Sequence, residues 1–189
     1  MNTEDLSLIQ QAVKGDQQAF QTLLGQQQGL IYSLCYRMLG NTAEAEDATQ
    51  EVFVKLWENL NAYQSENKLS TWLYKIASNY CLDKLKKEKV KRLYMDRKGV
   101  TEIANNTVNE TMFTELSQAI QALSGRLPAK QRMVFVLAVM EHQSIAEIAV
   151  VTNMNKGQVK SNLYYARQQM SAMLKKYYSE KQKSATDEL

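Results

Sequence analysis

Apolar residues recur every three or four positions along most of the chain, a spacing that predicts helices with one buried face. In the first half, this spacing covers residues 4–39, with a break at Gly15, and it resumes from Asn41. A polar stretch, 61–68, then precedes a long predicted helix whose apolar stripe begins at Leu69. The first half of the chain is therefore expected to be helical throughout.

The second half shows the same periodicity, with a helix predicted over 111–124 and a final one to about Tyr178. Pro128 suits the first turn of another helix. Between them, Ser144 is followed three residues later by Glu147, and Asn155 by Gln158, both in the spacing of a capping box. The two boxes predict two short helices joined by a tight turn, which is the pattern of a helix-turn-helix. The alternative interpretation of the same pattern is an ordinary corner between two helices of a bundle.

Composition supports an all-α fold. Seven Gly and one Pro in 189 residues are too few for the many turns of a β protein. Weak periodicity near Asn105 predicts a linker, so we expect two small helical domains joined by a flexible linker, the C-terminal one a helix-turn-helix. The expected boundaries are a first domain at 1–95, a linker at 96–110, a second domain at 111–178 and a polar tail at 179–189.

Catalytic chemistry is not indicated. The chain has one histidine, His142, and neither the residue spacing of a zinc site nor a phosphate-binding glycine loop. We therefore predict that the protein is not an enzyme and uses no cofactor or metal. Cys35 and Cys81 fall inside apolar patterns and are interpreted as buried side chains in a reducing compartment. With no secretory signal and no apolar run long enough for a membrane span, a cytoplasmic location is expected.

Charge is informative only locally, because the whole chain carries a formal net charge of just +3. From Lys75 to Lys98 there are nine Lys and Arg against three Asp and Glu, and from Lys156 to Lys183 seven against one. Over 61–92, aromatic residues are interleaved with cations. Cations bind a nucleic-acid backbone and aromatic rings stack on bases, a combination that suits a single-stranded or locally opened nucleic acid. A solvated basic face is the alternative interpretation.

The last helix can be divided into two faces at 3.6 residues per turn. One face is apolar and predicted to lie in a core: Val159, Leu163, Ala166 and Met170. The other contains no carboxylate, which suits a helix that enters a DNA groove: Gly157, Ser161, Tyr164, Tyr165 and Gln168, flanked by Lys160 and Arg167.

A third signal is an acidic helix with two apolar ridges at 47–57. Phe53 and Trp57 form the second ridge, beside Asp47, Gln50 and Glu51. Such a helix has one ridge for its own core and the other free for a partner helix, although both ridges can also be internal.

Taken in order, these segments resemble bacterial RNA polymerase sigma factors of the extracytoplasmic-function type. The matching segments are 15–20, 36–41, 45–57 and 71–79 in the first half, and 127–132, 147–149 and 159–161 in the second. The resemblance implies a subunit that binds core RNA polymerase and directs promoter recognition, DNA opening and transcription initiation. It further implies promoter DNA as a partner and an anti-sigma factor, which in this family is frequently anchored in the membrane.

The resemblance also implies residue roles. Core polymerase binding falls on Asp47, Gln50, Glu51, Phe53 and Trp57. Binding of the −10 element falls on Tyr63, Ser70, Thr71, Trp72, Lys75, Asn79 and Asp83, with the 61–68 loop as the pocket for a flipped base. Binding of the −35 element falls on Arg132, Lys156, Lys160, Ser161, Tyr164, Tyr165 and Arg167.

Two rival hypotheses remain at this stage: a DNA-binding regulator that never joins polymerase, because 128–168 also resembles response-regulator output domains, and a helical adaptor with no DNA role. The chain departs from the family pattern in having Asn162 in place of a frequent arginine and Asn153 in place of a turn glycine. It also lacks a glycine in 141–143. Asn tolerates a left-handed backbone, so the turn at Asn153 is expected to survive.

Overall fold

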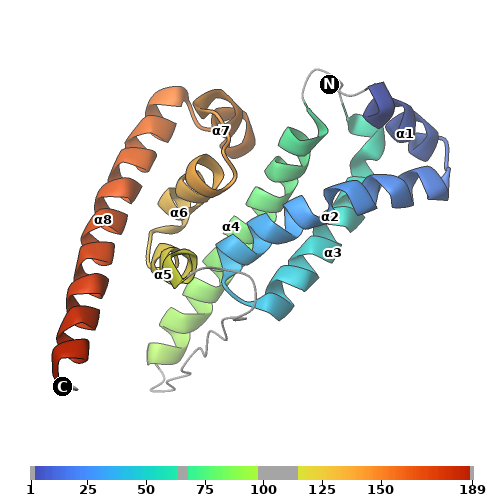
Figure 1. Cartoon of the computed structure of the whole chain (residues 1–189). Coiled ribbons are helices and arrows are strands. Elements are labelled where there is room, and N and C mark those ends of the chain that lie inside the picture. The colour runs from blue at the N-terminus through green and yellow to red at the C-terminus, as the bar shows by residue number, and fades with distance from the viewer. Residues whose placement is uncertain (1–2, 64–67, 98–114, 188–189) are drawn as a thin grey trace.

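A computed structural model describes residues 3–63, 68–97 and 115–187, and within these ranges the chain is helical with no strand, as predicted. The N-terminal half contains α1 (Thr3–Val13), α2 (Gln17–Leu39), α3 (Thr42–Asn59), the short 3-10 helix η1 (Leu60–Ala62) and α4 (Leu69–Arg97). The C-terminal half contains α5 (Glu115–Ser124), α6 (Ala129–Phe135), the π-helical segment η2 (Val136–Met140), α7 (Ile145–Thr152) and α8 (Lys156–Asp187). Figure 1 shows α4 running between the two halves, with α8 along the outer edge.

The predicted breaks between the first helices are confirmed, and local chemistry explains them. Asp16 caps α2 by accepting hydrogen bonds from the backbone N–H groups of Gln18 and Ala19, at 2.9 and 3.1 Å. Gly40 ends α2 with a left-handed φ of 74°, a conformation that favours glycine. Asn41 then opens α3 by accepting from the backbone N–H of Glu44 at 3.0 Å.

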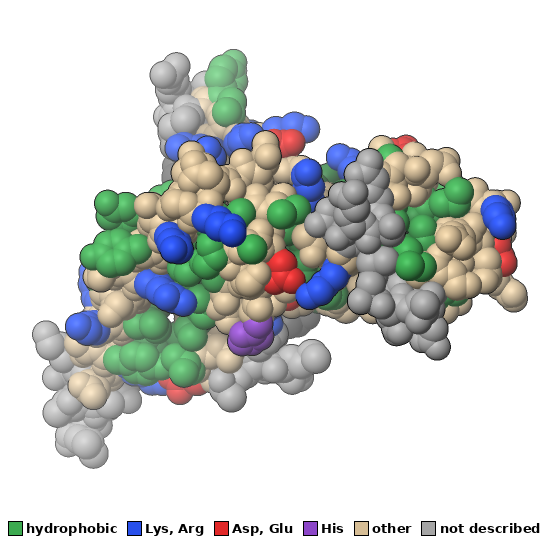
Figure 2. Space-filling view, turned by 90° about the horizontal axis from the view of Figure 1, so that it is seen from above, with side chains coloured by type: hydrophobic (Ala, Val, Ile, Leu, Met, Phe, Trp, Pro, Cys, Tyr) green, Lys and Arg blue, Asp and Glu red, His purple; other side chains and the backbone are tan. Residues whose placement is uncertain are grey.

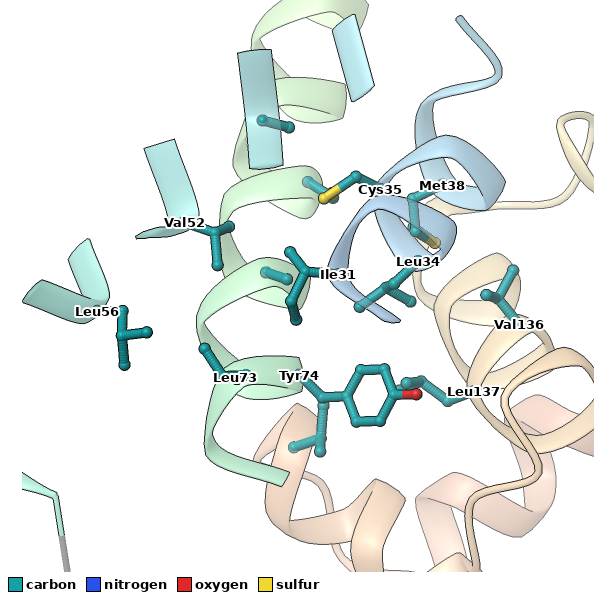
Figure 3. Packing of buried hydrophobic residues seen from close by; sticks show 14 of the residues in the cluster. Ile31, Leu34, Cys35, Met38, Val52, Leu56, Leu73, Tyr74, Val136 and Leu137 are labelled. Carbon is teal, nitrogen blue, oxygen red and sulfur yellow. The ribbon is translucent and has the colours of Figure 1, made fainter. Parts of the chain in front are cut away.

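One apolar cluster fills the space between α2, α3 and α4. Ile31 of α2, Val52 of α3 and Leu73 of α4 are fully buried within it (Figure 3). Cys35 and Cys81 are also buried there, as predicted, with their Sγ atoms 3.9 Å apart. Burial of apolar surface from three helices is what holds these helices against one another.

This cluster does not stop at the end of the N-terminal half. It continues into η2 through Leu137 and into α7 through Ile148 and Val151, all of which are buried. Figure 3 shows Leu137 beside Tyr74, which is itself 2% exposed on α4. The C-terminal half therefore packs directly on α4, with α7 and α6 as the contacting helices.

The C-terminal half also has a core of its own, where α8 packs on α5 and α6. Its buried members are Leu123, Leu127, Phe135, Ala166 and Met170. The expectation that the last helix ends near Tyr178 is wrong, because α8 continues to Asp187. Ion pairs on its surface support the extension, Lys176 with Glu180 at 3.7 Å and Lys181 with Glu115 of α5. The predicted linker lies outside the described residues except for the end of α4.

Candidate functional site

The two faces predicted for the last helix are present in α8. Val159 and Ala166 are fully buried, with Leu163 and Met170 nearly so. On the opposite side Tyr164 and Tyr165 are 59% and 56% exposed, with ring centroids 5.5 Å apart. Lys156, Gly157, Lys160, Ser161, Arg167 and Gln168 are exposed as well.

Viewed from above, the part of the molecule that holds α7 and α8 carries Lys and Arg side chains among hydrophobic ones, with few acidic groups (Figure 2). Such a surface offers cations for phosphate oxygens and aromatic or small side chains for a groove. We call the exposed residues of α8 from Lys156 to Arg167 the α8 face.

Local hydrogen bonds fix the angle at which α8 follows α7. Ser144 and Glu147 form the predicted capping box, with Ser144 Oγ accepting from the Glu147 N–H at 3.2 Å. Asn153 ends α7 with a φ of 53°, the left-handed conformation expected for it. Asn155 and Gln158 exchange backbone-to-side-chain hydrogen bonds of 3.0 and 2.8 Å at the start of α8. The helix-turn-helix geometry is therefore set by residues within three positions of one another.

The start of α7 is also tied to the N-terminal half. Glu147 pairs with Lys68, immediately before α4, at 3.0 Å. The backbone N–H and the hydroxyl of Ser144, together with Lys68, lower the pKa of Glu147 to about 2. Glu147 therefore stays ionised across the neutral range.

The predicted −10 residues divide into an exposed group and a covered group. Lys75, Asn79 and Asp83 are exposed and lie four residues apart on one line along α4. Thr71 is 5% exposed, and Ser70 is half-buried. The line from Lys75 to Asp83 is called the α4 face below.

Two aromatic side chains of the predicted −10 group come together at the start of α4. Trp72 is half-buried and packs on Tyr63, with ring centroids 5.3 Å apart. A half-buried tryptophan agrees with its position on the apolar stripe and leaves part of the ring accessible. Residues 64–67 of the predicted base pocket lie outside the described residues.

The predicted polymerase-binding residues lie together on α3. Asp47, Gln50 and Glu51 are exposed. Phe53 is half-buried against the core, and Trp57 is 45% exposed with its ring edge-on to Phe20 at 4.6 Å. The second apolar ridge is thus partly internal at Phe53 and open to solvent at Trp57.

Arg132, which the resemblance assigns to the −35 surface, is buried between the two halves in this structure. Its side chain is 6% exposed and donates from Nη2 and Nε to the Arg37 carbonyl at the end of α2, at 2.9 and 3.2 Å. Gln121 donates to the carbonyls of Tyr36 and Arg37 at 3.0 and 3.3 Å. The Tyr36 carbonyl also accepts from the backbone N–H of Gly40 at 2.8 Å, and a cation is favourable at this C-terminal end of the helix. Burial lowers the Arg132 pKa to about 10, which leaves it charged at neutral pH.

A polar cluster between the two halves was missed by the sequence analysis. The carboxylate of Glu141, just after η2, accepts from Arg37 Nη1 at 2.7 Å, Tyr74 Oη at 2.8 Å and Ser33 Oγ at 3.2 Å. These four residues are called the Glu141 node. His142, which follows, has a left-handed φ of 52°. No local pattern signals the node, because its members lie 67 to 108 residues from Glu141 in sequence.

Neither a metal site nor a membrane span is found in the part of the chain that the structure describes. No group of three or more His, Cys, Asp or Glu side chains is placed to hold a metal ion there. Within the same residues, no helix combines the length and the apolar character needed to cross a bilayer.

Family models match both halves of the chain. Sigma-70 region 2 matches residues 23–90, and Sigma-70 region 4 matches 117–170. The ECF RNA polymerase sigma factor SigW of Bacillus subtilis is 36% identical over 178 residues, covering 88% of this chain and 95% of that protein. The ECF RNA polymerase sigma factor SigE of Mycolicibacterium smegmatis is 31% identical, covering 90% of this chain and 68% of that protein.

Two solved structures share the fold. The sigma factor RpoE in complex with the anti-sigma factor NepR from Bartonella quintana superposes with a TM-score of 0.68, at 22% identity, over 82% of this chain and 96% of that one. CnrH in complex with the cytosolic domain of CnrY gives a TM-score of 0.66, at 24% identity, over 91% of this chain and 97% of that one.

Proposed function

The chain belongs to the ECF RNA polymerase sigma factors and is an alternative sigma factor directing promoter recognition and transcription initiation; we propose that it does so through three separate surfaces. These are the α8 face for the −35 element, the α4 face for the −10 element and the exposed side of α3 for core polymerase. Each proposal rests on which side chains are exposed and what they can bind.

The α8 face supports −35 binding most directly, and it is the observation that carries the proposal. Its buried stripe fixes which side points outward, and the outward side has cations at Lys160 and Arg167 with Ser161 between them. Small residues let a helix approach base edges, while flanking cations neutralise phosphates. Lys156 and the two exposed tyrosines, Tyr164 and Tyr165, complete the proposed −35 surface.

The α4 face supports binding of the −10 element. Lys75 supplies charge for a phosphate, and Asn79 supplies both a donor and an acceptor for a base edge. Tyr63 and Trp72 are an aromatic pair beside this line, and aromatic faces stack on unpaired bases. We assign the remaining residues, Ser70, Thr71 and Asp83, to the same surface.

The exposed side of α3 supports binding of core polymerase. It combines the carboxylates of Asp47 and Glu51 and the amide of Gln50 with the partly exposed ring of Trp57. An exposed aromatic side chain ringed by polar groups is a common centre of a protein interface. Phe53 supports this surface from beneath.

Transcription in vitro tests the proposed function as a whole. Core polymerase with the full chain is expected to give promoter-specific transcripts from a promoter library, and core alone is expected to give none. The same assay distinguishes this function from that of a DNA-binding regulator, which does not restore initiation to core polymerase. Absence of specific transcripts with a folded chain would contradict it.

The polymerase surface is tested by a double variant, Glu51→Lys with Trp57→Ala. We expect it to lose co-purification with core polymerase while helix content stays unchanged, because both side chains are exposed. Glu58→Lys, an exposed charge reversal on the same helix, is the matched control. Undiminished binding of the double variant would place the interface elsewhere.

The solved relatives support an anti-sigma factor as a further partner. RpoE and CnrH were each determined with a bound protein, described as the anti-sigma factor NepR and the cytosolic domain of CnrY. We propose that this chain is regulated in the same manner, that it works in the cytoplasm and that the chemistry of RNA synthesis belongs to the polymerase core.

A further inference from the structure

The two cysteines of the chain meet in the core between α2 and α4. Cys35 of α2 and Cys81 of α4 are both free and fully buried, and their Sγ atoms lie 3.9 Å apart. They are 46 positions apart in sequence, so only the packing of the two helices brings them together. Figure 3 shows the Cys35 side chain directed toward α4. The three proposed binding surfaces use neither thiol.

The surroundings make the two thiols chemically unequal. Cys81 Sγ donates a hydrogen bond to Cys35 Sγ. This bond, with Thr49 and Lys84, holds the pKa of Cys35 below its usual value, although burial acts in the opposite direction. The same hydrogen bond and burial raise the pKa of Cys81. Cys35 is therefore the thiol that ionises more readily, and the thiolate is the nucleophilic form.

Two cations next to the pair distinguish it from an inert structural pair. A thiol in a purely apolar core is unreactive because burial disfavours its thiolate. Here Lys84, whose side chain is 24% exposed, favours negative charge on both sulfur atoms, and the buried Arg132 favours it on Cys81. Charges that are shielded from water in this way are screened little by salt. The pair is therefore buried and electrostatically activated at the same time.

From this geometry we propose that Cys35 and Cys81 form a modification site at which a hydroperoxide converts the two thiols into a disulfide that ties α2 to α4 and weakens −10 binding. The effect on DNA rests on the proposed function of the α4 face, whereas formation of the disulfide does not. In a reducing compartment such a disulfide is transient, because reducing thiols restore the starting state.

The reaction has two steps. The Cys35 thiolate attacks one oxygen of the peroxide, so that an S–O bond forms and the O–O bond breaks. The other oxygen takes up the proton that Cys35 released and leaves as water or an alcohol. The Cys81 sulfur then attacks the sulfenic sulfur of Cys35, and the expelled hydroxyl leaves with the Cys81 proton as water. Two thiols lose two electrons in total, and one hydroperoxide gains them.

Burial determines which oxidants act and which product forms. Both thiols are 0% exposed, so an oxidant reaches them through brief local openings of the helices, which favours a small hydroperoxide over a bulky disulfide. Burial also keeps other thiols away from the sulfenic acid, while Cys81 is already 3.9 Å from the Cys35 sulfur. The expected product is therefore a disulfide within the chain.

The consequence falls on the α4 face. Asn79 and Asp83 lie two positions before and two positions after Cys81 on α4. To form the bond, the sulfur atoms must approach from 3.9 Å to about 2 Å. A closely packed core transmits such a displacement to the helices that carry the side chains. The disulfide therefore shifts this part of α4 relative to α2, and the proposed −10 contacts shift with it.

The first test follows the thiols of the reduced full-length chain after exposure to hydrogen peroxide. The wild type is expected to lose both free thiols and the mass of two hydrogen atoms, with both cysteines in one cross-linked peptide that a reducing thiol separates. Cys81→Ala is expected to accumulate a sulfenic acid at Cys35, which dimedone traps. Cys35→Ala is expected to react about tenfold more slowly, because its remaining thiol ionises less readily. Circular dichroism verifies folding, and the wild-type result decides alone if a variant unfolds.

The second test measures open complexes with protein that is freed of peroxide before core polymerase is added. Oxidised wild type is expected to form roughly threefold fewer open complexes than reduced wild type, as loss of one contact does. A −35 duplex is expected to bind both forms equally, because the α8 face is distant in sequence from both cysteines. The double variant Cys35→Ala with Cys81→Ala is the control and is expected not to respond to peroxide.

Three results overturn the proposal. They are two free thiols in the wild type after peroxide, equal open-complex formation by its oxidised and reduced forms, and a peroxide response that persists in the double variant. If the disulfide forms in the first test but reduced wild type gives no open complexes, the proposed promoter function fails instead.

Discussion

The two longest helices, α4 and α8, have similar sequence patterns but different surroundings. Both carry an apolar stripe in a core and a basic, aromatic-containing side away from it. The outer side of α8 is open to solvent along the α8 face, whereas the first turns of α4 lie beneath the C-terminal half, where Thr71 and Tyr74 are buried. For α8, which is buried on one side, helical periodicity in the sequence is enough to predict the exposed face. For α4, which is buried on two sides, the sequence alone does not predict which residues stay exposed.

The largest expected difference between these helices is in stability. Leu73→Ala in α4 is expected to cost roughly 3–5 kcal/mol, because Leu73 is fully buried where neighbours on several sides hold the cavity open. Leu163→Ala in α8 is expected to cost roughly 2–3 kcal/mol, since that site is nearer the surface and can relax. Urea unfolding followed by circular dichroism measures both. Equal losses of unfolding free energy in the two variants would contradict the proposed difference in packing between α4 and α8.

The next effect concerns DNA affinity and is confined to α8. Lys160→Ala or Arg167→Ala is expected to weaken binding of a −35 duplex evenly across sequences and to reduce the salt slope by about one unit each. A larger side chain at Ser161 is expected to change sequence preference instead, by about 1–3 kcal/mol per mismatched base pair. Titrations at several salt concentrations separate the two effects. Reversed outcomes for Lys160 and Ser161 would mean that the helix is rotated in the groove.

A comparable substitution on α4 is expected to affect promoter opening rather than duplex binding. Lys75→Ala and Asn79→Ala are expected to reduce open complexes roughly tenfold, as loss of one or two good contacts does. Permanganate reactivity of thymines near the −10 element reports this, and −35 duplex affinity is expected to stay unchanged. Lys14→Ala removes an exposed charge far from α4 and serves as the control. Normal opening in both variants would move the −10 surface off this line.

The smallest effect concerns the ion pair that joins α7 to the start of α4. Because the Glu147 pKa is about 2 in the folded chain against an ordinary value of 4.5, its ionised form stabilises the fold above about pH 4.5. This contribution is lost as the pH falls toward 2. Glu147→Gln is expected to cost less than about 1 kcal/mol at pH 7, because the pair with Lys68 is solvent-exposed. The unfolding midpoints of the wild type and of Glu147→Gln are expected to converge as the pH is lowered from 7 to 2. A difference that stays constant over this range would contradict the stabilising role assigned to ionised Glu147.

The features that the sequence predicted correctly depend on residues close together in the chain. Ser144 and Glu147 meet within one turn, and the buried stripe from Val159 to Met170 follows from helical periodicity alone. The all-α fold and the family also followed from such local patterns. The assignment of α4 to the −10 element and of α8 to the −35 element came from the resemblance. Which single residues contact DNA stays a prediction.

The features that sequence reasoning missed depend on contacts between distant segments. Arg132 was assigned to DNA from its place in a motif, but tertiary packing puts it on the end of α2, 95 residues away from its partner Arg37. Glu141 attracted notice only because its segment lacks a glycine. Which of many charged residues becomes buried and paired depends on the packing of both halves, and neither periodicity nor capping chemistry encodes it.

The long sequence separation within the Glu141 node also sets an order in time. Tyr74 precedes Glu141 by 67 residues, and a ribosome adding about 5–20 residues per second needs roughly 3–13 s to cover that interval. From the addition of Arg97, which completes α4, until Glu141 is reached, the nascent chain contains α4 but not the segment that will cover it. A polymerase or an anti-sigma factor that binds the growing chain at this point therefore meets an α4 that the C-terminal half does not yet cover. In the finished protein the C-terminal half already occupies that surface.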